Sequence, residues 1–366
     1  MGSTYGKILN ISIFGESHGP AVGVTIDNFP CGIEVDMDFI MQEMSRRAPS
    51  DAPSSTSRRE KDIPQIVSGV KNGVTTGAPI TILIENTNAK SGDYSPFATT
   101  PRPGHADFTA NVRYSGHHDP NGGGHFSGRL TAPIVFAGAL CKLALKRDNI
   151  KIGAHLLQVG DMFDDQFTQS ILNESLLDEL RTKNAPIINP LAETAIDKLV
   201  RDTAAKGDSI GGVVECAVLN APAGLGSPIF DAVESRLSSF LFSIPAVRGV
   251  EFGAGFGVAF MSGSENNDEF YMDEGKIRTK TNNHGGALGG ITTGMPILFR
   301  TAFKPTPSIF KTQNTVDLVQ RCDATVTING RHDPCIAFRA VPVCEAAAAI
   351  VLLDLYLEAY GYEKFR

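Results

Sequence analysis

Short apolar runs separated by long polar loops constrain the fold of this chain more than any other feature of its sequence. Five runs are apolar or β-branched and are bounded by Gly, Pro or Asn, as β-strands are. These expected strands are 22–27, 80–85, 213–219, 258–261 and 296–301. Longer stretches with helical spacing predict helices at 36–47, 132–147, 196–206, 231–242 and 343–360. Because strands and helices do not alternate regularly, the order excludes a doubly wound parallel sheet and favours an α+β fold.

Composition narrows the class of protein. The chain has 366 residues, a formal net charge of −7, 42% hydrophobic and 20% charged residues, which excludes a disordered chain. No basic tail offsets the acidic charge, so binding to nucleic acid is not expected. The most apolar stretch, 346–353, is far shorter than the ~20 residues that span a membrane, and the N-terminus lacks a signal-peptide pattern. Six dispersed cysteines without a CxxC pair indicate reduced thiols and a cytoplasmic protein.

Two pairs of segments repeat in the same order along the chain. Residues 73–80 (GVTTGAPI) match 290–297 (GITTGMPI), and residues 17–33 align without gaps on 209–225. The pattern favours a duplicated half-unit inside a single domain spanning 1–366, with halves at about 1–190 and 200–366. The alternative is that Gly-Thr-Pro turn sequences recur by chance.

Loops rich in Gly, His and Arg carry the residues that we expect to do chemistry. FGESHGP (14–20) places His18 after a β-like run, and RPGHAD (102–107) places Arg102 and His105 beside a fixed Pro-Gly turn. A histidine supplies a proton near neutral pH, and an arginine binds an anionic oxygen. A structural role is the alternative for each residue taken alone.

A third loop contains three consecutive glycines directly before an expected helix. GGGHFSGRLT (122–131) carries His125 and Arg129. Glycine N–H groups at a helix N-terminus can bind an anion, and Arg129 adds a positive charge there. A phosphate or nucleotide site and a plain helix cap are the two interpretations. A Rossmann site is rejected, because GAGFG (253–257) lacks the GxGxxG spacing and a following helix.

A fourth loop, GRHDPC (330–335), places an arginine, a histidine and an aspartate in succession. Nothing in the sequence lowers the pKa of Cys335, so we expect a buried thiol rather than a nucleophile. KPTPS (304–308) adds a stiff turn with one cation and two hydroxyls, which suits a phosphate.

The spacing of the histidines offers a different interpretation. Several potential metal ligands lie close together in sequence: His105, Asp107, His117, His118, Asp119 and His125. Imidazole and carboxylate groups are common metal ligands. The alternative function is therefore a metal-dependent phosphoesterase.

Together these motifs resemble those of the chorismate synthase family, and the resemblance runs nearly from end to end. The segments that carry it stand in family order: FGESHG (14–19), MSRRAP (44–49), GVTTGAPI (73–80), RPGHAD (102–107), GGGHFSGRLTA (122–132), DSIGG (208–212), PAGLG (222–226), GGALGGITTG (285–294), KPTPS (304–308), and GRHDPC with RAVP (330–342). No single motif is decisive, but ten in the family's order are very specific.

The resemblance implies a lyase that converts 5-enolpyruvylshikimate 3-phosphate into chorismate and inorganic phosphate, the last step of the shikimate pathway. This anti-1,4-elimination has no net redox change, yet the family requires reduced FMN, with NADPH or an external flavin reductase as the source of electrons. The substrate's phosphate and two carboxylates suit an arginine-lined pocket. The resemblance also implies antiparallel sheets that sandwich helices, and a homotetramer.

The same resemblance assigns roles to individual residues. His18 would donate a proton toward the leaving phosphate, His105 would donate toward the reduced flavin, and Asp333 would assist proton removal at the flavin N5. The implied substrate-binding residues are Arg47, Arg102, Arg129 and Arg331, and Arg47 is also the implied NADP-binding residue. Since four uncompensated guanidinium groups repel one another, we expect this cluster to need an anionic ligand.

The implied flavin contacts come from several loops. They are His125, Phe126, Ser127, Pro245, Ala246, Gly289, Lys304, Pro305, Thr306, Pro307, Ser308 and Arg331. Many family members have Arg-Ser-Ser where this chain has His125-Phe126-Ser127, so Ser127 is the most secure of those three contacts. Many bacterial members also have an arginine at the position of Pro53, a contact that Arg58 or Arg59 would have to replace.

Overall fold

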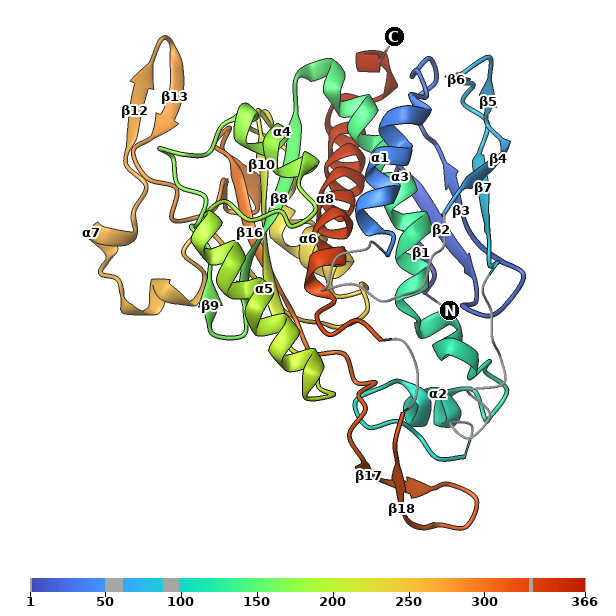
Figure 1. Cartoon of the computed structure of the whole chain (residues 1–366). Helices are drawn as coiled ribbons and strands as arrows, with labels where there is room; N and C mark the ends of the chain where they lie inside the picture. The colour runs from blue at the N-terminus through green and yellow to red at the C-terminus, as the bar shows by residue number, and fades with distance from the viewer. Residues whose placement is uncertain (1, 50–61, 88–98, 329–331, 366) are drawn as a thin grey trace.

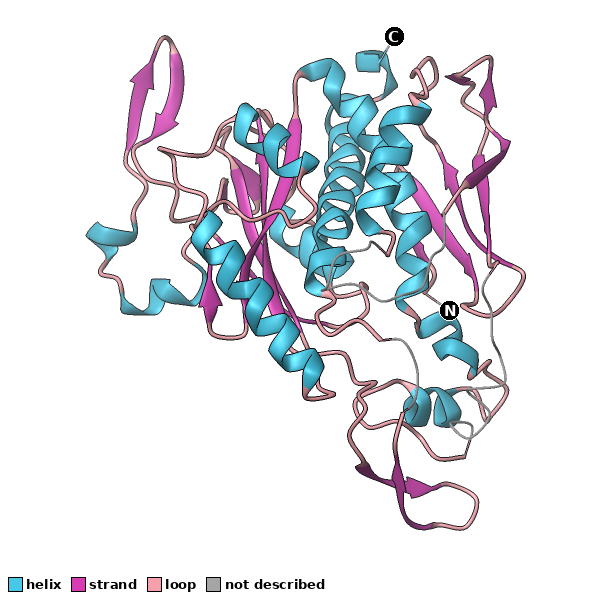
Figure 2. Cartoon of the chain, viewed as in Figure 1, coloured by secondary structure: helices cyan, strands magenta, loops and turns pink. Residues whose placement is uncertain are grey.

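The computed structural model describes residues 2–49, 62–87, 99–328 and 332–365. Within these residues, two five-stranded antiparallel sheets enclose a layer of helices (Figure 1). The strand order is β1-β2-β3-β7-β4 in the first sheet and β11-β16-β10-β8-β9 in the second. Figure 2 shows the two sheets on either side of the central helices. The expected α+β sandwich is therefore confirmed.

The first sheet is built from residues 4–85 alone, whereas the second combines strands from both halves of the chain. The first sheet contains β1 (Thr4–Tyr5), β2 (Asn10–Gly15), β3 (Ala21–Asp27), β7 (Ile80–Glu85) and β4 (Pro64–Ser68). The second contains β11 (Val247–Phe252), β16 (Ile297–Phe303), β10 (Gly212–Leu219), β8 (Lys151–Val159) and β9 (Met162–Phe163). Alternation along β7 directs Ile80, Ile82 and Ile84 inward, where all three are buried. The period of two thus fixes which face of this sheet meets the helices.

The helices fall into an inner and an outer set. The inner helices are α1 (Met37–Arg47), α3 (Thr131–Leu145), α6 (Val233–Leu241) and α8 (Ala337–Tyr360). The outer helices are α2 (Asp107–Arg113), α4 (Glu174–Thr182), α5 (Pro190–Ala205) and α7 (Gly263–Asn266). Helix α3 packs on the first sheet, α8 packs on the second, and the two helices pack on each other.

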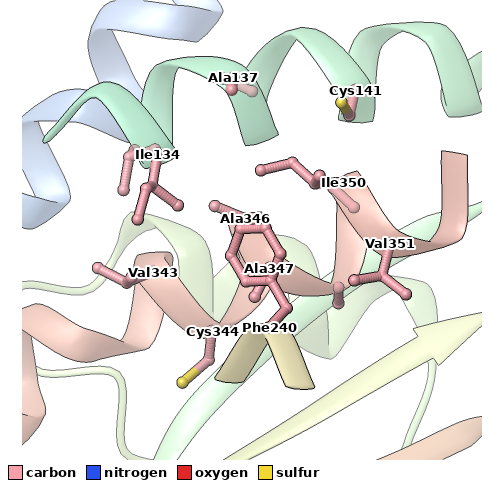
Figure 3. Packing of buried hydrophobic residues seen from close by; sticks show 14 of the residues in the cluster. Ile134, Ala137, Cys141, Phe240, Val343, Cys344, Ala346, Ala347, Ile350 and Val351 are labelled. Atoms are coloured by element: carbon pink, nitrogen blue, oxygen red, sulfur yellow. The ribbon is translucent and has the colours of Figure 1, made fainter. Parts of the chain in front are cut away.

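Helices α3 and α8 form the centre of the core (Figure 3). Both helices are buried on nearly all sides, so most of their residues are apolar around the whole circumference, and the buried charges Lys142 and Glu345 pair with each other. Gly138 allows the two helices to approach closely, since a Cβ at that position would lie 2.3 Å from the Cα of Ala346. Segments 128–148 and 337–360 are long and apolar enough to cross a membrane by length and composition alone, but their most apolar windows are 89% and 100% buried.

Two expectations about local structure are wrong. Residues 258–261 do not form a strand: 258–260 lie in a 3₁₀ segment, η5 (Gly255–Phe260), and Met261 follows it. The side chains of Phe256 and Phe260 in this segment are exposed to solvent. A short apolar run predicts a strand only where a neighbouring strand covers it. The helix expected from residue 231 also starts later, because Ala232 directly precedes α6 and Asp231 instead pairs with Lys7 at 2.5 Å.

The repeated segments have the same local structure. Strand β3 pairs with β7 so that Val24 lies opposite Ile82, and β10 pairs with β16 so that Cys216 lies opposite Phe299. These two pairs of residues match under the offsets of the sequence repeat. The register is therefore the same in both halves, as half-units require, while their origin by duplication stays a prediction.

Four small hairpins complete the part of the chain that the structure describes. They are β5 (Val70–Lys71) with β6 (Val74–Thr75), β12 (Phe270–Asp273) with β13 (Lys276–Thr279), β14 (Ala287–Leu288) with β15 (Ile291–Thr292), and β17 (Gln313–Asp317) with β18 (Cys322–Val326). Figure 1 shows that β12–β13 and β17–β18 project from the body at opposite ends. We refer to residues 255–279, which contain η5, α7 and β12–β13, as the arm.

Candidate active site

A cavity of about 1370 Å³ gathers most of the residues singled out in the sequence. Those that line it are His18, Arg47, Arg102, His105, His125, Phe126, Ser127, Arg129, Pro245, Ala246, Lys304, Thr306, Pro307, Ser308 and Asp333. Pro305 and Gly289 are not among its lining residues, and Gly289 lies in the turn between β14 and β15. Arg331, Pro53, Arg58 and Arg59 lie outside the described residues. Loops distant in sequence thus converge on one site.

The inner helices place the first arginine. Arg47 is the last residue of α1, which begins after Asp36, whose side chain accepts a hydrogen bond from the Phe39 N–H. A buried charge cluster next to it fixes α1 against α8, since Arg46 donates to both carboxylate oxygens of Glu345 at 2.7 and 2.6 Å. Arg47 therefore enters the cavity from a rigid helix end.

Arg47 and Arg129 share one carboxylate. Arg47 donates to the carboxylate of Asp62 at 2.5 Å, and Arg129 donates to its other oxygen. Arg129 also donates through Nε to the side-chain oxygen of Asn86 at 2.9 Å and through Nη2 to the Glu85 carbonyl at 3.2 Å. The expectation of uncompensated guanidinium groups is wrong for this pair, because Asp62 neutralises part of their charge.

Burial disfavours the charged forms of both Arg47 and Asp62. Burial lowers the pKa of Arg47 to about 10, because Asp62 offsets only part of the desolvation and the nearby charges of Arg339 and Arg129 lower it further. Burial alone would raise the pKa of Asp62, but the charges of Arg47 and Arg129 outweigh it and hold the pKa below its ordinary value. Among the described residues, the buried Nε of Arg47 has no hydrogen-bond partner, so Arg47 keeps a donor for a ligand.

Arg102, His105 and Asp107 form a compact group at the start of α2. Arg102 donates to both oxygens of Asp107 at 2.7 Å, and the Nδ1 of His105 lies 2.7 Å from the same carboxylate. Since a carboxylate only accepts, Nδ1 carries the proton in this contact. Burial alone would raise the pKa of Asp107, but hydrogen bonds from Arg102 and His105 hold it well below its ordinary value. Asp107 thus orients His105.

Asp333 is paired with an arginine that the motif analysis did not single out as a ligand. Arg339 donates to the carboxylate of Asp333 at 2.5 Å and, through Nε, to the Arg47 carbonyl at 2.8 Å. It also lines the cavity. Its position in the RAVP segment was the available signal, but spacing alone could not show that it reaches Arg47. Asp62 and Asn86 were missed for the same reason.

His125, Phe126 and Ser127, which stand where many members of the family that the chain resembles have Arg-Ser-Ser, each have a defined contact in the structure. The Nδ1 of His125 lies 2.9 Å from the Gly15 carbonyl, and its Nε2 lies 3.0 Å from the Ser3 hydroxyl. This ring therefore holds β2 and the N-terminal segment against the cavity wall. Phe126 faces Tyr114, with ring centroids 6.3 Å apart. Ser127 accepts a hydrogen bond from the Arg129 N–H at 3.3 Å and caps the turn that precedes α3.

A second cationic region lies at the 304–308 loop. Lys304 donates to the Gly104 carbonyl, and its backbone N–H donates to the carbonyl of Ala246, a residue with a φ of 75°. Burial and the nearby charge of Arg248 lower the pKa of Lys304. Arg248 lines the cavity as well. Two cations here, beside the hydroxyls of Thr306 and Ser308, suit an anionic group.

The structure does not support two other candidates from the sequence, a Cys335 nucleophile and a metal site. Cys335 is buried, as expected, and burial raises the pKa of its thiol to about 12. Within residues 2–49, 62–87, 99–328 and 332–365, no group of three or more His, Cys, Asp or Glu side chains could hold a metal ion. The phosphoesterase alternative finds no support.

Known proteins resemble this chain over almost its whole length. The family model described as chorismate synthase matches residues 9–357. Chorismate synthases of Thermococcus kodakarensis and Thermococcus gammatolerans are 44% identical over 364 residues and 46% identical over 363 residues, covering 98% of this chain and 98% of each relative. A structure described as "Crystal Structure of Chorismate Synthase" matches with a TM-score of 0.73 and 28% identity, covering 98% of this chain and 94% of its own. This chain therefore belongs to the chorismate synthase family of carbon–oxygen lyases.

Proposed function

We propose that the cavity catalyses the anti-1,4-elimination of phosphate from 5-enolpyruvylshikimate 3-phosphate to give chorismate, with reduced FMN as the cofactor. The observation that carries this proposal is the convergence of His18, His105 and Asp333 with a set of arginines on one cavity. Its volume of about 1370 Å³ exceeds the 300–1,000 Å³ typical of a site for one small ligand. Room for two ligands side by side supports a substrate bound next to a flavin.

Arginines supply the recognition of the substrate in this proposal. The substrate carries a phosphate and two carboxylates, and planar guanidinium groups bind such anions through paired hydrogen bonds. Arg47 and Arg102 are held by carboxylates on one side, which fixes the direction in which their remaining N–H groups point. We propose the same role for Arg129 and, by resemblance alone, for Arg331. Arg47 is 2% exposed, so NADPH could reach it only through the cavity.

The acid–base groups act on two sides of the substrate. His18 donates a proton toward the leaving phosphate, which leaves more readily as its charge is neutralised. His105 donates toward the cofactor, and Asp107 behind it holds the ring in place through Nδ1. Asp333, oriented by Arg339, accepts a proton on the cofactor side. Each of the three side chains borders the cavity.

The residues at the 304–308 loop fit a flavin phosphate. Lys304 and Arg248 supply positive charge, Thr306 and Ser308 supply hydroxyl groups, and Ser127 lies on the same cavity. Pro245 and Ala246 supply an apolar wall for a ring system. When bound, reduced FMN supplies an electron-rich ring that assists cleavage of the substrate's bonds without net redox change. NADPH or a separate flavin reductase would keep the FMN reduced.

The arm supports assembly into a homotetramer. Its large apolar side chains face solvent, with exposed fractions of 84% for Phe256, 92% for Phe260 and 67% for Met272. Several large apolar side chains exposed on one projecting segment favour an interface between proteins. We propose that a second copy of this chain covers the arm and that the tetramer is cytoplasmic. Sedimentation velocity tests the assembly, because Phe256→Ser with Phe260→Ser should shift tetramers to smaller species.

Flavin binding tests the placement of the cofactor. Lys304→Ala should weaken FMN affinity roughly 10- to 100-fold, since it removes a charged hydrogen bond worth about 1.5–3 kcal/mol. Lys311→Ala is the matched control, because Lys311 pairs with Asp208 at the exposed surface. Titration calorimetry measures both variants. Equal affinity in Lys304→Ala and in the parent protein would place the flavin phosphate elsewhere.

A further inference from the structure

The three consecutive glycines, Gly122, Gly123 and Gly124, form a turn beside both histidines of the cavity. All three have positive φ angles, of 59°, 85° and 51°. The N–H of Gly123 donates to the Pro120 carbonyl at 3.2 Å, so it is used within the turn. The Gly123 N–H is therefore not directed at an anion, and the contacts that a Cβ on these glycines would make indicate another purpose for this turn.

Gly122 lies directly against the ring of His18. A Cβ at Gly122 would stand 1.9 Å from Nδ1 and 2.0 Å from Cε1 of this ring. Both distances are far below van der Waals contact, so any side chain here would displace the imidazole. The ring occupies the space that a side chain at residue 122 would otherwise fill.

Gly123 has the same relation to His105. A Cβ at Gly123 would stand 3.0 Å from both Cε1 and Nε2 of that ring. His105 cannot easily move aside, because its Nδ1 is held at 2.7 Å by Asp107, which Arg102 holds in turn. Even a methyl group would therefore press on the edge of His105 that carries Nε2.

Gly124 joins this turn to the loop that carries His18. The N–H of Ser17 donates to the Gly124 carbonyl at 3.1 Å. Since Gly122 and Gly123 are neighbours in the chain, their Cα atoms are about 3.8 Å apart, which keeps the two rings within about 12 Å of each other. One turn therefore sets the positions of both rings.

We propose that Gly122 and Gly123 are positioning residues: the absence of side chains at these two positions fixes where the imidazoles of His18 and His105 stand. The placement of the rings follows from packing alone. Its effect on turnover rests on the proposed function, in which both histidines transfer protons. Ring placement and turnover must therefore be measured separately.

Three alanine variants test this placement. Gly122→Ala and Gly123→Ala each add one methyl group against one ring. Gly73→Ala is the matched control, because Gly73 has a φ of 75° and nothing within 4 Å of an added Cβ. It carries the same backbone strain without touching a histidine. Each variant is made in the full-length protein and compared by thermal unfolding before any other measurement.

Ring signals of ¹³C-labelled histidine report placement without turnover. His18→Ala and His105→Ala spectra assign the two rings. We expect Gly122→Ala to shift the His18 signals, Gly123→Ala to shift the His105 signals, and Gly73→Ala to shift neither. Unshifted signals in the first two variants would overturn the proposal. This result is independent of whether the parent protein forms chorismate.

Turnover tests the consequence for catalysis. Gly122→Ala should lower kcat by roughly 100-fold or more, the usual contribution of a positioned acid–base group, and Gly73→Ala should not. In a His18→Ala background, Gly122→Ala should cause no further loss, because both changes act through one ring. An equal loss in both backgrounds would overturn the proposal.

A folding failure is also informative. If Gly122→Ala does not fold, the double variant with His18→Ala separates the causes. Folding of the double variant would support contact with the ring. Its failure to fold would place the conflict in the backbone and overturn the proposal.

Discussion

Three aspartates compensate arginines in the cavity: Asp62 binds Arg47 and Arg129, Asp107 binds Arg102, and Asp333 binds Arg339. Each carboxylate is buried or nearly so. The arginines are therefore held in fixed directions before any ligand enters, which reduces the entropy lost on binding. At the residue scale, these pairs preorganise the site, and they replace the expectation that an anionic ligand alone stabilises the arginines.

Asp62→Asn tests the importance of the shared carboxylate. Removing one partner of a buried ion pair should lower the free energy of unfolding by about 3 kcal/mol at pH 7. Asp178→Asn is the control, because Asp178 pairs with Lys151 at the exposed surface, and it should change stability by less than about 0.5 kcal/mol. Urea denaturation measures both variants.

The pH dependence of this effect has a definite sign. The folded-state pKa of Asp62 is lowered, so its contribution is present above the unfolded pKa of about 3.9. It is lost as the pH falls through the folded-state pKa. The difference between the parent protein and Asp62→Asn should therefore shrink in acid, and a constant difference would contradict the assignment.

The elements show what a sequence can and cannot reveal. Helix α1 and strands β3 and β7 were predictable because their buried apolar residues repeat with the period of a helix or a strand. Strand β10 was predictable because it is a short apolar run, which is buried almost throughout. Strand β8, which pairs with β10, was missed in the sequence. Its polar residues interrupt the apolar pattern by which a strand is recognised. Buried His155 is one of these, since Asp164 and Glu215 satisfy it at 2.9 and 3.1 Å. Such long-range partners leave no local signal.

His155 joins β8 to β10 through this charged contact, and its effect should depend on pH. Burial alone would lower the pKa of His155, but hydrogen bonds to Asp164 and Glu215 outweigh it and raise the pKa above its ordinary value. The contribution to stability is therefore present below the unfolded pKa of about 6.5 and is lost as the pH rises through the folded-state pKa.

His155→Gln should remove this dependence and destabilise the protein by about 3 kcal/mol at pH 6, where two buried carboxylates lose a charged partner. Thermal unfolding at pH 6 and pH 9 measures the effect. The parent protein should lose more stability between these pH values than the variant does. An identical loss in both would show that His155 is neutral throughout.

At the scale of the whole molecule, equivalent hydrogen bonds occur within each of the two halves, in addition to the common strand register. The hydroxyl of Thr75 donates to the Pro30 carbonyl at 2.7 Å and accepts from the Ile33 N–H at 3.0 Å. Thr292 makes the same two contacts with Pro222 and Leu225, at 2.6 and 2.9 Å. Each half thus has one threonine that joins its β-strand loop to its hairpin. The halves are not identical at the cavity, because His18 of the first half matches Ile210 of the second.

Thr75→Val and Thr292→Val should have similar effects on stability. Each change leaves a buried N–H and a buried carbonyl without a partner, at a cost of about 1–3 kcal/mol. Thr194→Val is the control, because its hydroxyl is exposed on α5. If one of the two buried changes is nearly neutral while the other is costly, the halves are not equivalent at these positions.

Turnover under anaerobic conditions tests the central claim most directly. The enolpyruvyl substrate is supplied with FMN reduced by dithionite, with oxidised FMN or with none, and chorismate and phosphate are measured together. We expect equal amounts of both products, and only with reduced FMN, which should remain reduced at the end. Equal rates with oxidised FMN or without flavin, or release of phosphate without chorismate, would contradict the account.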